Sequence, residues 1–329
     1  MTNDNKYLIR SYNSGEEGNI IKLWNASLPH DQICQGVFNR KILLDPNFDP
    51  AGLIIAEEIK TQELIGFIYC ITRKLPVDAD GPLEPEKGWI PAMGVRNREW
   101  MNVGVGQALM EAAETYFKGK ERQMIIASSY SPNYFFQGID RDNYPANYTL
   151  FEVNGYKCIE ESVSMGIDLY SYVTPDSVLE KERELEREGY KFCYLRVDQV
   201  ISLFKYIKQY HSPGWVRLVR VLLHSTDDWE RVSVVTYCDE VVGFNRFSDP
   251  DLVIERFGPF GVKPDLRGKG IGKVLLARCL DTMKRKGVHF AWFQWTNENS
   301  AADTIYKKAG FRVIRRYFTM MKDLDYGAR

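Results

Sequence analysis

The sequence predicts a mixed α/β fold in two tandem copies, each an α+β arrangement with a mostly antiparallel mixed sheet flanked by helices. Three observations lead to this prediction. The chain has 329 residues, which fits two domains of ordinary size. Strand-like and helix-like apolar periods alternate along it. A weak internal repeat also places the same landmarks in both halves, so the fold is expected to occur twice.

The repeat consists of two pairs of matching segments. Residues 103–110 (VGVGQALM) match 269–276 (KGIGKVLL), and each segment opens a stretch with helical apolar spacing. Further along, residues 150–156 (LFEVNGY) match 305–311 (IYKKAGF). The N-terminal copy holds about eleven extra residues between its landmarks, and the aromatic segment 131–140 is the expected insertion.

A charged stretch separates the two copies. Residues 177–188 contain many charged and few apolar side chains, a composition typical of a solvated helix or a linker. We therefore predict a degenerate N-terminal domain over residues 1–170, a linker over 171–189 and a C-terminal domain over 190–329.

Apolar periodicity predicts the elements of the second copy in order. Strands are expected over residues 191–197, 232–238, 241–247, 253–262, 289–295 and 312–321, and helices over 200–210, 215–224, 271–286 and 300–309. Asp239 and Glu240 are expected to form the hairpin turn between the second and third of these strands. Helices between strands of this kind give a mixed sheet.

The composition excludes several classes of partner and site. Lysine and arginine total 43 and aspartate and glutamate total 44, so no net field attracts nucleic acid or an anionic membrane. No segment approaches about 18 uninterrupted apolar residues and no leader is evident, so we expect a soluble cytoplasmic protein. The six cysteines form no CxxC pair, which predicts neither a metal site nor a disulfide framework.

One local anion site is nevertheless predicted after the 253–262 strand. In the loop 263–272 (KPDLRGKGIG), glycines let successive backbone N–H groups approach a ligand without an intervening Cβ. The following helix adds the positive end of its dipole, and Arg267, Lys269 and Lys273 add charge. The loop is therefore expected to hold a pyrophosphate.

Two familiar phosphate-binding loops do not match. A Walker A loop needs a glycine five positions before Gly272, where Arg267 stands, and Ser or Thr at Val274. A dinucleotide-binding loop needs a third glycine where Lys273 stands.

The residues that do fit form an ordered set. Arg267-Gly-Lys-Gly-Ile-Gly272, followed by residues 299–306 (NSAADTIY) and 307–311 (KKAGF), resembles the GNAT family of N-acetyltransferases. The resemblance covers roughly residues 190–322 and, more weakly, the N-terminal half. Two fused copies are similar to the tandem members of the family, distantly to mycothiol synthases. The resemblance implies acetyl-CoA as co-substrate.

The family pattern also implies a set of residues that bind the coenzyme. The glycine loop would hold the pyrophosphate, and the pantetheine arm would lie between strands that separate at residues 260–262 and 289–295. Asn299 would hydrogen-bond that arm, although it is equally suited to cap the following helix. The complete set is Phe260, Gly261, Val262, Arg267, Gly268, Lys269, Gly270, Ile271, Gly272, Lys273, Asn299 and Ala302. A backbone N–H near Val262 would face the thioester carbonyl.

An acid and a base complete the implied site. Tyr306 stands where the family has a tyrosine near the thioester sulfur, so it would protonate the departing thiolate; the alternative is a tyrosine that packs in the core. Glu255, on the strand entering the loop, is the first candidate for the base that an amine nucleophile needs.

Other candidates are weaker. Asp249 and Asp251 also suit a turn, and His289 suits a structural role. Trp292, Phe293 and Trp295 could form a wall of the acceptor pocket or belong to the core.

The first copy departs from the pattern at three functional positions. Met101, Phe151 and Tyr144 stand where the second copy has Arg267, Tyr306 and Asn299. A cation and an acidic hydroxyl are thereby lost, so this half is expected to be a scaffold or acceptor-binding domain, with residual coenzyme binding left open. Its insertion, which contains Tyr134, Phe135, Phe136, Asp140 and Asp142, could cover the acceptor cleft or pack in the core.

The sequence thus predicts an acetyl-CoA-dependent N-acetyltransferase that acts on a primary amine of a small molecule by direct attack in a ternary complex. Alternatives are a protein N-terminal or lysine acetyltransferase, and a catalytically silent CoA-binding regulatory module. No nucleic acid or membrane partner is expected, and the chain would be a monomer or a homodimer.

Overall fold

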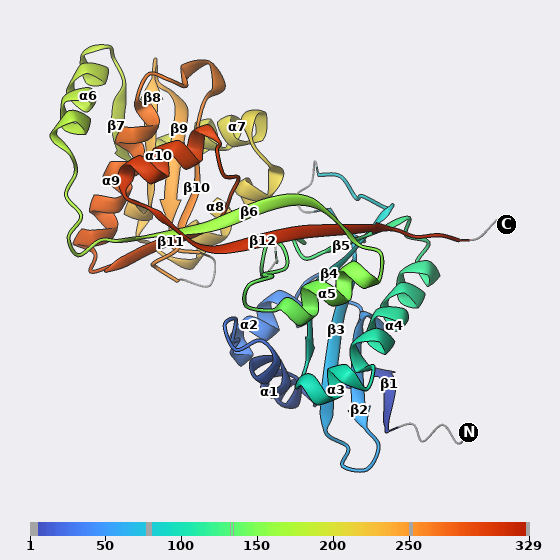
Figure 1. Cartoon of the computed structure of the whole chain (residues 1–329). Helices are drawn as coiled ribbons and strands as arrows, with labels where there is room; N and C mark the ends of the chain where they lie inside the picture. The colour runs from blue at the N-terminus through green and yellow to red at the C-terminus, as the bar shows by residue number, and fades with distance from the viewer. Residues whose placement is uncertain (1–5, 77–80, 132, 134, 250–252, 327–329) are drawn as a thin grey trace. The chain divides into compact units, whose positions relative to one another are not determined.

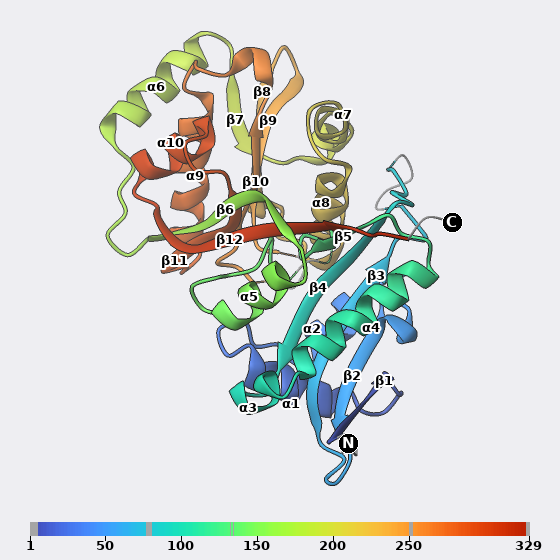
Figure 2. The same ribbon diagram turned by 45° about the vertical axis from the view of Figure 1, so that its right-hand side comes forward.

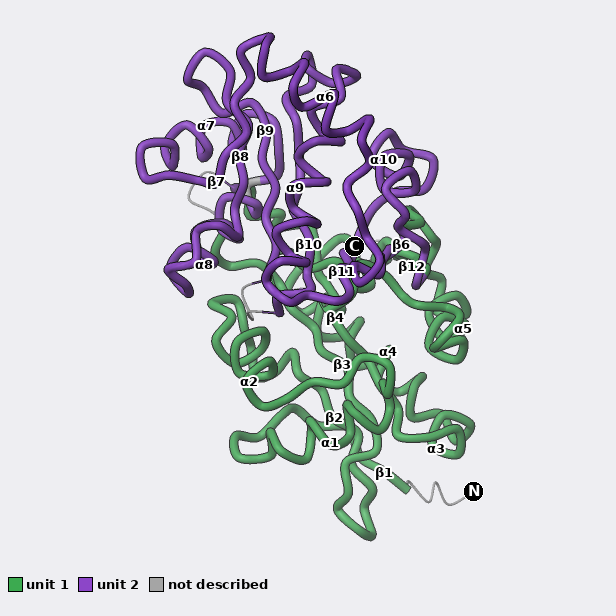
Figure 3. Tube along the Cα trace, turned by 90° about the vertical axis from the view of Figure 1, so that its left-hand side faces the viewer, with its two compact units in different colours: residues 1–76, 82–162, 316–329 green, residues 77–81, 163–315 purple. Residues whose placement is uncertain are grey.

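The computed structural model describes residues 6–76, 81–131, 133, 135–249 and 253–326. These residues form two compact units (Figure 3). The first unit contains the chain up to residue 76, residues 82–162 and the C-terminal segment from residue 316; the second contains residues 77–81 and 163–315. The chain therefore crosses from the first unit to the second within one strand and returns to the first unit within another.

This division differs from the predicted one. The chain enters the second unit within strand β6 (Lys157–Asp168), before the expected linker, and leaves it within β12 (Arg312–Asp323). Part of that linker is helix α6 (Asp176–Arg187), whose Leu185 is buried in the second unit's core. The end of β12 belongs to the first unit because its apolar side chains, such as Phe318, are buried in that unit's core.

The first unit is a mixed sheet with helices on both faces. Its strands are β1 (Tyr7–Ser11), β2 (Leu53–Glu58), β3 (Leu64–Thr72), β4 (Lys87–Val95) and β5 (Met124–Ala127), followed in the sheet by β12 and β6. Its helices are α1 (Glu17–Ser27), α2 (Gln35–Phe38), α3 (Arg98–Asn102), α4 (Val105–Gly119) and α5 (Pro145–Val153). Strands β1 with β2, β2 with β3, β3 with β4 and β5 with β12 pair antiparallel, and β4 pairs parallel with β5. Figure 2 shows α4 lying along β2, β3 and β4.

The second unit contains an antiparallel sheet in the order β10-β9-β8-β7. Its strands are β7 (Lys191–Tyr194), β8 (Val232–Tyr237), β9 (Glu240–Phe247) and β10 (Phe257–Val262), and β11 (Phe290–Thr296) pairs instead with β6. Its further helices are α7 (Val200–Tyr210), α8 (Pro213–Ser225), α9 (Ile271–Arg285) and α10 (Ala301–Ala309) (Figure 1).

Alternation along β9 assigns these helices to opposite faces of the sheet. Val241 packs with residues of α7 and α8, such as Leu203 and Val219. Val242 packs with Leu275 of α9 and Leu185 of α6. The edge strand β10 therefore has α7 and α8 on one side and α9 on the other.

The internal repeat is confirmed in the backbone. Gly104 and Gly270 precede α4 and α9 with the same φ of +93°, and both helices have 15 residues. Helices α5 and α10 both have nine residues. After them, the N–H groups of Tyr156 and Phe311 donate to the carbonyls of Phe151 and Tyr306, respectively.

Several predicted boundaries in the second unit shift, among them the end of the 191–197 strand, which lies at Tyr194. The hairpin turn lies at Cys238 and Asp239, both with positive φ, one residue earlier than expected. The predicted 253–262 strand begins only at Phe257, because the Arg256 N–H donates to the Val253 carbonyl and closes a turn there. Helix 200–210 is confirmed at both ends.

Three further properties bear on the expected class. None of the described helices is long and apolar enough to cross a membrane. All six cysteines are free. Within the described residues, no group of three or more His, Cys, Asp or Glu side chains could hold a metal ion.

The position of β12 gives a test of the two-unit division. Phe318→Ala should lower the free energy of unfolding by about 3–5 kcal/mol, because it leaves a cavity in the first unit's core. Ile314→Ala, on the same strand but 45% exposed, should cost much less. Urea unfolding followed by fluorescence measures both, and equal losses would contradict the assignment of this strand segment to that core.

Candidate active site

Strands β10 and β11 meet at one point and then separate. The Trp292 N–H donates to the Glu255 carbonyl at 3.0 Å, and Arg256 forms an isolated parallel bridge with Trp292. Beyond this point β10 pairs with β9 and β11 with β6, so the two strands continue in different sheets. This is the separation that the family resemblance implies for a pantetheine arm.

A β-bulge lies in β10 beside the separation. Phe257 pairs with Phe247 but Phe260 pairs with Asn245, so β10 has one residue more than β9 between these pairs. Gly258 in the bulge has a φ of +95°, a conformation that side chains disfavour. Bulges redirect a strand locally, and here the redirected segment is 260–262, which the sequence assigned to the coenzyme.

The glycine loop presents a row of unsatisfied backbone donors. After a short 3₁₀ turn, the Arg267 N–H still donates to the Pro264 carbonyl. The N–H groups of the next five residues, 268–272, have no acceptor among the residues that the structure describes. Gly268 and Gly270 hold left-handed φ values of +84° and +93°. Successive free donors at a helix N-terminus constitute an anion site.

Cations surround this loop. Arg267, Lys269 and Lys273 are exposed, as the sequence suggests. A fourth cation, Lys181 of α6, was missed: a Cβ added at Gly270 would lie 2.9 Å from its Cγ. The sequence pattern could not reveal Lys181, because residues 171–189 were predicted to form a linker. A larger residue at Gly270 would therefore disturb the protein itself as well as a ligand.

Tyr306 lies in an aromatic cluster and is 7% exposed. Its ring packs on those of Phe257, Phe260, Phe293 and Phe311, with the Phe293 centroid nearest at 4.4 Å. Burial raises the pKa of its hydroxyl, and that hydroxyl has no hydrogen bond to any described residue. The Tyr306 ring therefore packs in the core. Its hydroxyl stays protonated at neutral pH because burial raises its pKa.

Asn299 does not cap α10. The cap is Ser300, whose Oγ accepts the Asp303 N–H at 3.1 Å. Asn299 precedes it with a φ of +63° and donates its own N–H to Asp303 Oδ2 at 2.9 Å. Its side chain is exposed, so its assignment to the coenzyme stays a prediction, and Ala302 on the first turn is partly buried beside the aromatic cluster.

The predicted base is not on a strand. Glu255 lies in the turn before β10, with an exposed side chain, and only its carbonyl takes part in the contact with β11. The Asp249 side chain accepts a hydrogen bond from the Val253 N–H at 3.0 Å. This is the structural role in a turn that the sequence offered as the alternative to a base. Asp251 lies outside the described residues. The identity of the base therefore remains open.

The three aromatic residues of β11 have different environments. Phe293 is 5% exposed and belongs to the core around Tyr306, whereas Trp295 is 50% exposed. The Arg256 guanidinium lies 4.5 Å above the Trp292 ring. His289 is exposed and precedes the strand.

Sequence reasoning missed a second polar pair, Tyr206 and His211. The His211 Nε2 lies 2.8 Å from the Tyr206 hydroxyl. A Cβ added at Gly261 would lie 2.5 Å from His211 Cε1 and 3.3 Å from that hydroxyl. The pair therefore contacts the coenzyme segment of β10 from the α7–α8 face. Apolar periodicity predicted the helix 200–210 that contains Tyr206, but it could not show which strand this helix covers.

The corresponding loop of the first unit satisfies part of its donors internally. The N–H groups of Met101, Val103 and Gly104 donate to carbonyls within and just before α3. A Cβ added at Gly106 would lie 2.7 Å from the Met101 sulfur, so that side chain covers the equivalent of Gly272. These contacts support the prediction that the first unit lacks a pyrophosphate site.

The other departures in the first unit serve packing. Phe151 is 3% exposed, and the Tyr144 hydroxyl donates to Asp31 at 2.6 Å. In the insertion, Phe135 packs on the Trp24 ring of α1, and Asp140 is 2% exposed. These residues therefore pack in the core, which was the alternative to covering an acceptor cleft. Tyr134 lies outside the described residues.

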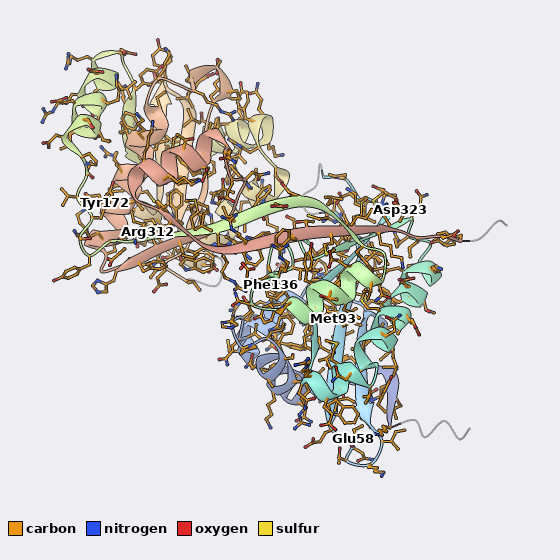
Figure 4. All side chains as sticks on the ribbon, in the orientation of Figure 1. Glu58, Met93, Phe136, Tyr172, Arg312 and Asp323 are labelled. Carbon is orange, nitrogen blue, oxygen red and sulfur yellow. The ribbon has the colours of Figure 1, made fainter. Side chains whose placement is uncertain are left out.

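An apolar pocket remains between β4 and α5 in this unit. Its lining includes Met93 and Phe136, both labelled in Figure 4.

Comparisons with known proteins bear on the second unit. Residues 228–313 match the family model described as Acetyltransferase (GNAT) domain. Streptothricin acetyltransferase of Streptomyces lavendulae is 40% identical over 50 residues, which are 15% of this chain and 26% of that protein. The ribosomal protein bS18-alanine N-acetyltransferase of Escherichia coli K12 is 34% identical over 59 residues, which are 17% of this chain and 40% of that protein. The chain thus matches less than half of the length of each relative.

A solved structure resembles both units together. A tandem GNAT protein from the clavulanic acid biosynthesis pathway has a TM-score of 0.64 and covers 98% of this chain and 100% of that one, at 12% identity. This likeness concerns the fold, and it confirms the predicted tandem mixed sheets flanked by helices. The distant similarity to mycothiol synthases stays a prediction.

The free donors of the glycine loop predict the effect of a small substitution. Gly268→Ala should weaken acetyl-CoA binding about tenfold, or about 1.4 kcal/mol, because the loop loses the left-handed conformation that exposes its N–H groups. Gly287→Ala is the matched control: its φ is +82° against +84°, and a Cβ at either site meets open space. Calorimetric titration that shows equal affinities for the two variants would contradict this site.

Proposed function

We propose that this chain, whose residues 228–313 form a GNAT acetyltransferase domain, transfers the acetyl group of acetyl-CoA to a primary amine of a small molecule. The observation that carries the proposal is the row of free N–H donors at residues 268–272, which follows β10, the strand that separates from β11 at its start. These two features supply an anion site and an adjoining open strand edge, which together suit a pyrophosphate with an extended amide arm.

The chain's donors fit a pyrophosphate in number and charge. Five adjacent N–H groups at the start of α9 offer hydrogen bonds to several oxygens. Arg267, Lys269, Lys273 and Lys181 add positive charge around them. When bound, acetyl-CoA supplies the activated thioester carbonyl, and the backbone of residues 260–262 is the segment proposed to hold the arm.

Tyr306 is proposed as the general acid. Its raised pKa keeps the proton on its hydroxyl at neutral pH, which a donor to a thiolate requires. The ring is held by four aromatic neighbours, so the hydroxyl has a fixed position.

Direct attack is favoured over a covalent acyl-enzyme. The cysteine nearest to this chemistry, Cys279 of α9, is fully buried in the core around Tyr306. Burial also raises the pKa of its thiol, so it is not a ready nucleophile. An amine that attacks in a ternary complex with acetyl-CoA needs no such group.

Two acceptor classes remain distinct proposals. The matched relatives bear the names of acetyltransferases for streptothricin, a small molecule, and for an alanine of a ribosomal protein. We favour the small-molecule acceptor, and acetylation of a protein N-terminus or lysine is the second candidate because of the bS18 relative. A silent CoA-binding module would not need the buried, protonated Tyr306.

Replacement of the tyrosine hydroxyl tests the assigned acid. Tyr306→Phe should lower turnover by about 100-fold or more, since general acids contribute on the order of 10²–10⁴, while acetyl-CoA affinity stays nearly unchanged. Thiol release and calorimetric titration measure the two quantities. Tyr237→Phe, in the same unit and 39% exposed, should change neither. If Tyr306→Phe loses affinity together with turnover, the tyrosine is structural.

A further inference from the structure

His211 is held rigidly at the end of α7. Its N–H donates to the Ile207 carbonyl at 2.9 Å. Its ring stacks on Trp215 of α8, with centroids 4.4 Å apart and planes 16° from parallel, and packs edge-on against Phe244 of β9. The imidazole is 2.8 Å from the Tyr206 hydroxyl through Nε2. Two helices and a strand therefore fix the position of one ring.

This ring lies directly on the backbone of β10. A Cβ at Gly261 would come within 2.6 Å of His211 Nε2, a contact that real side chains do not make. Gly261 has no left-handed φ that would itself require glycine. The absent side chain is therefore explained by the imidazole. Gly261 follows the bulge and precedes Val262, so the ring contacts the redirected segment next to the separation of β10 and β11.

The ring is uncharged at neutral pH. Burial and then the positive charge of Arg267 lower the His211 pKa to about 4. The folded-state pKa is depressed below its ordinary value, so the imidazole becomes charged only as the pH falls toward 4. Burial raises the pKa of Tyr206. The other rings packed on His211, those of Trp215 and Phe244, are apolar, and Tyr210 packs on Tyr206, so a neutral imidazole hydrogen-bonds a neutral phenol.

We propose that His211 accepts the proton that the amine loses during acetyl transfer, with Tyr206 as the positioning residue that fixes its tautomer. This assignment rests on the proposed acetyltransferase function. It replaces the exposed Glu255 as the leading candidate base, because His211 adjoins the coenzyme segment and Glu255 lies on an outer turn.

The proposed step balances. The amine nitrogen bonds to the thioester carbon, and one amine proton passes to the free ring nitrogen of His211. The carbon–sulfur bond then breaks, and the sulfur takes a proton from Tyr306. The proton on His211 restores Tyr306 through solvent, so the products are the amide and the free thiol.

His211→Gln tests this proposal, because glutamine keeps a polar group against Trp215 but has no basic nitrogen. His224→Gln, an exposed histidine of α8, is the matched control. Thiol release from acetyl-CoA is followed between about pH 5 and 9.5, with D-glucosamine, with an alanine-led peptide, and with water alone as nucleophile. Acetyl-CoA affinity is measured in parallel by calorimetric titration.

We expect His211→Gln to lower turnover by about 100-fold or more with an affinity within about twofold of the parent. Added imidazole should restore part of its rate, because a free base can replace the missing ring nitrogen. Tyr206→Phe should lower turnover less and keep the parent's pH dependence. His224→Gln should behave as the parent.

The outcomes separate the two proposals. If the parent neither binds acetyl-CoA nor releases thiol with any nucleophile, the proposed function fails. If the parent is active and His211→Gln matches it across the pH range, only the role of His211 fails. A variant that loses acetyl-CoA affinity in proportion to turnover would show that His211 supports the β10 backbone instead.

Discussion

The second unit depends on a row of backbone N–H groups that the protein itself leaves unsatisfied. Five consecutive donors, three before α9 and two in its first turn, have no acceptor among the described residues, and free donors of this kind are costly unless water or a ligand binds them. Gly268 and Gly270 make the arrangement possible through left-handed φ values. In the first unit, α3 precedes the matching glycine, and the N–H groups of Val103 and Gly104 donate to its carbonyls. The two copies therefore share a fold and differ in how many of these donors stay free.

The edge strand β10 connects this loop to the rest of the site. Its bulge and its separation from β11 open the strand edge just before the loop. Its two faces carry different chemistry: Tyr306 packs on Phe260 in the core shared with α9 and α10, and His211 lies on Gly261 from α7 and α8. The proposed acid and the proposed base therefore lie on opposite faces of the same strand.

Much of this arrangement could be predicted from local sequence. The glycine loop, the helix after it and the repeat landmarks depend on short-range patterns, and the structure reproduces them. Long-range pairing could not be predicted in this way. The last strand joins the first unit through the burial of Phe318, Lys181 reaches the loop from a charged helix, and His211 meets Gly261 across 50 residues of chain. Glu255 was predicted to lie on a strand, but it lies in a turn that is closed by the hydrogen bond from the Arg256 N–H to the Val253 carbonyl. The sequence pattern does not show this bond.

The central claim is that the N–H groups of residues 268–272 bind the coenzyme's pyrophosphate. The most direct measurement is a ¹H–¹⁵N NMR titration of the labelled chain with CoA, which observes each amide separately. We predict large, saturable shifts for Gly268, Gly270 and Gly272, toward the values of hydrogen-bonded amides, and small ones for Gly104 and Gly106 of the first unit. Unchanged loop amides at saturation, or larger shifts at Gly104 and Gly106, would contradict the account.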